Sequence, residues 1–197
     1  MTRHAHYFDA KQVSYAGILP TALRANRLRL PQGDTAADTT CRAVTQVIRT
    51  LVSRQDGPTF VNLVVLGGRG NIGRQLIRTL TRRNENASAT LPPILVIDKG
   101  DALPGNGPVL LVNCSLPGAI DEHALSIPFY SMVLNEVYPA PKQATIDVLT
   151  GRSVKLFHVS GVQGKAWPAF PHEYRDAIPC CAALADQDLQ AVVTQLN

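Results

Sequence analysis

Val61-Asn-Leu-Val-Val-Leu66-Gly67-Gly-Arg-Gly-Asn-Ile-Gly73 is the stretch that decides the fold of this chain. It begins with a mostly apolar, β-branched run, which is typical of a buried strand in a parallel sheet. Residues 74–80 follow with apolar side chains at helical spacing and predict the start of an amphipathic helix. Between the strand and the helix, Gly68, Gly70 and Gly73 form a GxGxxG turn. This order of strand, glycine turn and helix predicts a dinucleotide-binding unit.

Each glycine of the turn has a physical role in such a unit. Gly68 permits the tight turn, Gly70 lets the backbone approach a pyrophosphate, and Gly73 allows the helix and the strand to pack closely. The N-terminus of the helix would then stabilise the phosphate charge. The other turn residues assigned to the cofactor are Arg69, Asn71 and Ile72. The alternative is a glycine-rich turn that merely closes a loop.

The next predicted strand ends in Asp98, where a dinucleotide site needs an acidic acceptor for the ribose hydroxyls. Asp98 follows Gly73 by 25 residues, which is longer than the usual interval of about 20, and the polar segment 84–90 accounts for the excess as a loop insertion. A carboxylate at this position disfavours a 2′-phosphate and favours NAD. Lys99 and Arg69 could offset that repulsion, so NADP remains possible.

Helical and β-branched segments alternate through the rest of the chain, which favours an α/β fold with a Rossmann-like, mostly parallel sheet and flanking helices. The Gly57-Pro58 turn divides a short N-terminal helical extension, residues 1–56, from a dinucleotide-binding domain, residues 57–197. The segment between Asp98 and Val109 is too short for a full crossover helix. The predicted helices are 37–53, 72–83, 142–150 and 186–196, and the predicted strands are 61–66, 94–98, 109–113 and 154–159.

Composition excludes several classes of protein. With 45% hydrophobic and 17% charged residues, the chain is neither a disordered tail nor a fibrous repeat. No apolar run approaches the roughly 18 to 20 residues that span a bilayer, and the N-terminus lacks a secretory signal, so we expect a cytoplasmic protein without a membrane partner. The four cysteines have no zinc-type spacing, which predicts reduced thiols and no metal. The arginines are spread along the chain, so we expect no nucleic-acid partner.

The third predicted strand ends in Asn113, Cys114 and Ser115, at the carboxyl edge of the sheet. Ligands bind at this edge in open α/β folds, so these three residues are predicted to border the nicotinamide. The alternative is a plain transition from strand to loop, in which Cys114 is a small buried filler.

The order of these segments resembles the C-terminal nucleotide-binding half of shikimate and quinate dehydrogenases, which belong to the amino-acid-dehydrogenase-like superfamily. Beside the glycine turn, the resemblance rests on residues 111–118 (LVNCSLPG), 135–141 (NEVYPAP) and 151–170, and it covers about Asp34 to Phe170. It implies an NAD(P)-dependent oxidoreductase. Such an enzyme would transfer a hydride to or from a small polar hydroxy/oxo or amino/imino acid.

The resemblance also implies roles for individual residues. Asp38 is the counterpart of an aspartate that works with a lysine on the substrate, and Lys11 is the only lysine before residue 99. Tyr138 would lie where substrate and nicotinamide meet, and Gln163 lies in the segment where the family has a substrate-binding glutamine. Helix capping is the alternative for Asp38, and a half-buried aromatic is the alternative for Tyr138. The other candidates for proton transfer are His158 and Lys165.

The extension of 56 residues is shorter than the substrate domain of that family. We therefore expect a homodimer, or a partner subunit, that completes the cleft around a small-molecule substrate. The alternative function is a non-catalytic Rossmann-type module that binds a nucleotide or acts as a scaffold together with a partner.

Overall fold

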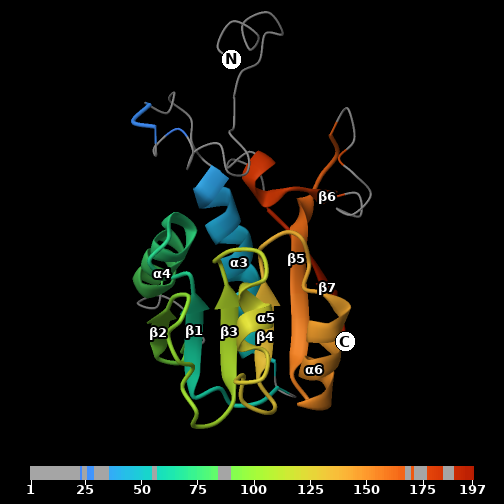
Figure 1. Cartoon of the computed structure of the whole chain (residues 1–197). Helices are drawn as coiled ribbons and strands as arrows, with labels where there is room; N and C mark the ends of the chain where they lie inside the picture. Colours follow the sequence, from blue (N-terminus) through green and yellow to red (C-terminus); the bar gives the residue numbers. More distant parts are fainter. Residues whose placement is uncertain are drawn as a thin grey trace, which may run out of the picture.

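The structure is a computed structural model that describes residues 23, 26–28, 36–54, 57–83, 90–166, 170, 177–183 and 189–197. These residues form an α/β fold with a mostly parallel sheet between helices, as predicted (Figure 1). The helices are α3 (Ala36–Val52), α4 (Asn71–Arg83), α5 (Ala119–His123), α6 (Gln143–Gly151) and the short 3-10 helix η3 (Cys180–Ala182). The strands are β1 (Asn62–Leu66), β2 (Ile94–Ile97), β3 (Val109–Asn113), β4 (Met132–Asn135), β5 (Lys155–Gln163), β6 (Ala177–Ile178) and β7 (Ala191–Gln195).

The described strands form one seven-stranded sheet in the order β2-β1-β3-β4-β5-β6, with β7 paired to β5. Strands β1 to β5 are parallel, and β6 and β7 run antiparallel to β5. The chain builds outward from β1 to β2 and then returns to place β3 on the other side of β1. The carboxyl ends of β1 and β3 therefore flank a topological switch point, the place where open α/β sheets bind ligands.

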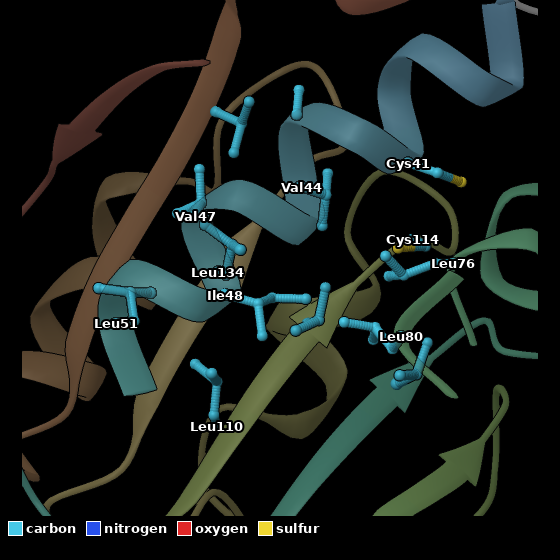
Figure 2. Packing of buried hydrophobic residues seen from close by; sticks show 14 of the residues in the cluster. Cys41, Val44, Val47, Ile48, Leu51, Leu76, Leu80, Leu110, Cys114 and Leu134 are labelled. Atoms are coloured by element: carbon cyan, nitrogen blue, oxygen red, sulfur yellow. The ribbon is translucent and has the colours of Figure 1, made fainter. Parts of the chain in front are cut away.

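One face of the sheet is covered by α3 and α4, which pack against each other. Figure 2 shows Val47, Ile48 and Leu51 of α3 lying over Leu110 of β3 and Leu134 of β4. These apolar side chains recur at helical spacing, so one stripe of α3 is buried as its sequence predicts. Although the sequence assigns α3 to the extension, this helix belongs to the same hydrophobic core as the sheet.

The opposite face of the sheet is covered by α5 and α6. Ile120 of α5 and Leu149 of α6 pack against Leu111 and Val133 of the central strands. Because both faces of β3 are covered, its five residues are all buried, which explains why the strand is apolar throughout.

The predicted C-terminal helix 186–196 is wrong, because residues 191–195 form β7. Leu189, Val192, Val193 and Leu196 do recur at helical spacing, but the segment Ala191-Val-Val-Thr-Gln195 is rich in β-branched residues and pairs with the free edge of β5. Strand β5 is also longer than predicted and extends to Gln163. Between β2 and β3 the chain forms no helix, in agreement with the short segment expected there.

The extra length of β5 gives the sheet an additional element at its carboxyl edge. His158 pairs with Asn135 of β4 on one side and with Thr194 of β7 on the other, whereas Val162 pairs with Ile178 of β6. Because a strand has two edges, β6 lies on the same edge of β5 as β4, just beyond the end of β4. This position brings the following residues, 179–181, over the carboxyl edge of the sheet.

Candidate functional site

The glycine turn lies directly at the switch point. The backbone N–H of Gly67 donates to the Ile97 carbonyl of β2, and the N–H of Cys114 donates to the Leu66 carbonyl of β1. Gly67 has a φ of 83°, a conformation that favours glycine, and a Cβ added to it would lie 2.7 Å from the Ser115 Cα. The turn therefore packs closely against both the β2 end and the β3 end of the sheet.

Two glycines of the GxGxxG turn are needed for this packing, and the third is open to solvent. A Cβ on Gly68 would lie 2.5 Å from Val96 Cγ1 of β2, and a Cβ on Gly73 would lie 2.6 Å from the Gly68 Cα. Gly70 is exposed, and a Cβ there would meet a single atom within 4 Å, the Gly67 carbonyl oxygen at 3.0 Å. Space for a ligand thus exists at Gly70, where the first turn of α4 begins with N–H groups that no helical carbonyl satisfies.

Asp98 stands at the end of β2 beside this turn, as predicted from the sequence. Its carboxylate Oδ2 lies 3.4 Å from Arg69 Nε, and Arg69 Nη2 lies 3.6 Å from Asp101 Oδ2. Asp101 Oδ2 also accepts a hydrogen bond from the Asp98 backbone N–H at 2.9 Å. Lys99 pairs with Glu122 of α5 at 3.0 Å. Arg69 therefore lies nearer to the Asp98 carboxylate than Lys99, which is engaged elsewhere.

A cavity of about 460 Å³ opens beside the turn at the carboxyl ends of β3, β4 and β5. Its lining combines Ile72 from the glycine turn with residues that follow β3 and β4 and with the segment after β6. The described lining residues are Ile72, Cys114, Ser115, Pro117, Glu136, Val137, Tyr138, His158, Val159, Ser160, Pro179, Cys180 and Cys181. The cavity thus adjoins the glycine turn at Ile72.

Glu136 is the acidic residue among these lining residues. It follows β4 directly, its backbone N–H donates to the Asn113 carbonyl, and its side chain is partly buried. Burial raises the pKa of its carboxyl to about 8, because an ionised carboxylate loses hydration inside the protein. Glu136 is not among the site residues predicted from the sequence. A signal was available, since a charged residue directly after a buried parallel strand lies at the ligand-binding edge.

Side-chain hydrogen bonds join the ends of β3 and β4 to His158 in the middle of β5. The Ser115 backbone N–H donates to Asn113 Oδ1 at 3.1 Å, and Asn113 Nδ2 donates to Asn135 Oδ1 at 2.8 Å. Asn135 Nδ2 donates to the Val137 carbonyl at 2.7 Å and lies 3.0 Å from His158 Nδ1. We call Ser115, Asn113, Asn135 and His158 the amide relay.

The amide relay fixes the tautomer of His158. The Ser115 N–H can only donate, so the Asn113 side-chain atom that faces it must be the amide oxygen. The Val137 carbonyl can only accept, so the Asn135 side-chain atom that faces it must be the amide nitrogen. Asn135 Nδ2 is then a donor toward His158 Nδ1, which must accept. A neutral His158 therefore carries its proton on Nε2.

The structure places the residues predicted from the sequence in several regions. Tyr138 lines the cavity, and Cys114, Ser115 and Ile72 do so as well. Asp38 lies on the exposed side of α3, where its Oδ1 accepts a hydrogen bond from Gln75 of α4 at 3.0 Å, and it does not line the cavity.

Two further residues predicted from the sequence, Gln163 and Lys11, are not among the described residues that line the cavity. Gln163 is exposed at the end of β5, where its backbone N–H donates to the Gln190 carbonyl. Lys11 lies outside the described residues. Within the described part of the chain, no three His, Cys, Asp or Glu side chains are placed to hold a metal ion.

Comparison with protein-family models, with curated proteins and with solved structures found no match for this chain. No helix in the described ranges combines the length and the apolar character that crossing a membrane requires.

Proposed function

We propose that this protein is an NAD(P)-dependent oxidoreductase that transfers a hydride to or from a small polar hydroxy/oxo or amino/imino acid. The observation that supports this function best is that an open glycine turn at the switch point adjoins a cavity of about 460 Å³, which Ile72 also lines. A dinucleotide needs a cradle for its pyrophosphate and an adjoining space for its nicotinamide and the substrate.

The residues of the glycine turn fit the phosphates of such a cofactor. Gly70 leaves space above the turn, and the first turn of α4 supplies N–H groups and a positive dipole end. Gly68 and Gly73 keep this cradle compact, because side chains there would overlap β2 or the turn itself.

Asp98 and Arg69 would hold the ribose of the adenosine half. The carboxylate of Asp98 accepts hydrogen bonds from ribose hydroxyls, which favours NAD, and Arg69 offers a cation to a 2′-phosphate. The two side chains now pair with each other, so either cofactor must compete with this ion pair. We propose NAD as the cofactor, with NADP as the second possibility.

The nicotinamide supplies the hydride chemistry when it is bound. Cys114, Ser115 and Tyr138 would border it, since all three line the cavity. The amide relay holds the strand ends that carry these residues in fixed positions. We propose that a partner subunit or a second copy of the chain completes the cleft.

A thermal-shift titration with NADH, NADPH and unrelated nucleotides tests the proposal, because a ligand that binds only the folded state raises the melting temperature. We expect saturable stabilisation by one nicotinamide cofactor and its loss in Gly70→Val, whose side chain fills the open space. Gly105→Val is the matched control, since a Cβ at Gly105 meets nothing within 4 Å. A folded wild-type protein that no nicotinamide stabilises would contradict the proposal and favour a scaffold without a cofactor.

A further inference from the structure

Glu136 lacks a compensating partner in the described part of the structure. No described residue forms a hydrogen bond or an ion pair with its carboxyl group, and none of the described lining residues is a lysine or an arginine. Much of the lining around it is apolar, including Ile72, Val137, Val159 and Pro179. Carboxylates inside proteins are normally paired, so an unpaired one in a cavity indicates a ligand site.

Three buried thiols lie within electrostatic reach of Glu136 and stay protonated near pH 7. The thiols of Cys41 on α3, Cys114 after β3 and Cys180 on η3 are close enough to be influenced by its charge. Burial raises the pKa of Cys41 and of Cys180 to about 12, and it raises the pKa of Cys114 well above its usual value. The other titratable side chains that line the cavity are Tyr138, His158 and Cys181.

Because these thiols stay protonated, they neither compensate nor repel an ionised Glu136. A ligand with its own negative charge would enter a cavity whose described lining residues include no lysine or arginine, and it would oppose ionisation of the Glu136 carboxyl. A ligand with a positive charge would supply the missing counter-ion. The charges of the described lining residues thus favour a cationic ligand over an anionic ligand of similar size.

We propose that Glu136 binds the ammonium group of an amine substrate inside this cavity. The inference rests on the proposed function and narrows its substrate to the amino/imino class, with the ammonium group rather than the carboxylate next to Glu136. Glu136 thereby becomes the substrate-binding residue of the site, and the protonated amine takes the place of the lysine or arginine that the described lining residues do not include.

Proton balance follows directly from this assignment. An alkylammonium ion has a pKa of about 10, close to that of a lysine, and enters as a cation. Glu136 is mostly protonated at pH 7, because burial holds its pKa at about 8. Forming the ion pair therefore releases the carboxyl proton to the solvent, close to one per bound amine. Below pH 8 the affinity should fall about tenfold for each pH unit.

Isothermal titration calorimetry tests this with isobutylamine, isobutanol and isobutyrate, three probes of similar shape and different charge. Titrations at pH 7 in two buffers of different ionisation enthalpy count the protons released. We expect isobutylamine to bind at least tenfold more tightly than the other two probes, with release of close to one proton. In Glu136→Gln this preference and the proton release should both disappear. Glu122→Gln is the matched control, because Glu122 lies on α5 and pairs with Lys99.

Equal affinity for isobutylamine and isobutanol would overturn the inference, as would binding without proton release or no binding of any probe. An unchanged preference in folded Glu136→Gln would also overturn it. No nicotinamide is present in these titrations, so their outcome is separate from that of the cofactor titration. Amine binding without any stabilisation by NADH or NADPH would refute the oxidoreductase and leave the amine site intact.

Discussion

Replacing Glu136 with glutamine should stabilise the protein, and the gain should grow with pH. In the unfolded chain Glu136 loses its proton near its ordinary pKa of 4.5, whereas in the folded protein burial holds the proton until about pH 8. The unfolded state therefore binds fewer protons between these two values, and the free energy of unfolding of the wild type falls as pH rises. Glutamine is neutral throughout and avoids this loss.

The magnitude follows from the two pKa values. One pH unit corresponds to about 1.36 kcal/mol, so full separation from 4.5 to about 8 gives a ceiling of about 5 kcal/mol above pH 8. Because the side chain is only partly buried, we expect on the order of 3 kcal/mol. Below pH 4.5 both side chains are neutral, and the two proteins should differ by less than about 1 kcal/mol.

Urea denaturation at a series of pH values from 4 to about 9 measures this difference directly. Glu122→Gln serves as control, since an exposed ion pair contributes less than about 1 kcal/mol. If the free energies of unfolding of wild type and Glu136→Gln stay parallel from pH 4 to 9, the burial of Glu136 has no energetic consequence and the reasoning fails. A difference that shrinks as pH rises would refute the assigned direction of the pKa change.

Further predictions concern the glycine turn and the amide relay. Gly73→Ala should lower the free energy of unfolding by about 1 to 3 kcal/mol, because its Cβ overlaps the turn, whereas Gly70→Ala should cost less than about 1 kcal/mol; urea denaturation compares the two. Asn135→Ala should cost about 2 to 4 kcal/mol, because it leaves the Asn113 amide and His158 Nδ1 buried without their partner. Nitrogen NMR shifts of His158 should then lose the preference for the Nε2–H tautomer, and an unchanged tautomer would show that the relay does not fix it.

The βα unit at the start of the domain could be predicted because its signals are local. The apolar run before Gly67 and the helical spacing after Gly73 each occupy a few consecutive residues, and each determines one element. β7 was missed for the opposite reason. The pattern of residues 191–195 fits both helical spacing and a β-branched strand. Pairing with the free edge of β5, about 30 residues earlier in the chain, decides in favour of the strand.

The chemistry of the site was harder to predict than its location. The prediction that Asn113 to Ser115 lie at the carboxyl edge of the sheet is confirmed, because the end of β3 could be located from its apolar run alone. The surroundings of Glu136 instead bring together segments from opposite ends of the chain, since Cys41 of α3 and Cys180 of η3 both lie within reach of its charge. Such an encounter between distant segments produces no periodic pattern in the sequence.

The amide relay has a consequence for how tightly any ligand can be held at this edge. One row of hydrogen bonds joins the ends of β3 and β4 to the middle of β5, so these three strands cannot shift in register independently of one another. Because the strands at the entrance of the cavity are already ordered, they lose little conformational entropy when a ligand binds. That entropy was lost when the protein folded. Differences in affinity between ligands should then reflect the groups that each ligand presents to the cavity, rather than rearrangement of the protein around it.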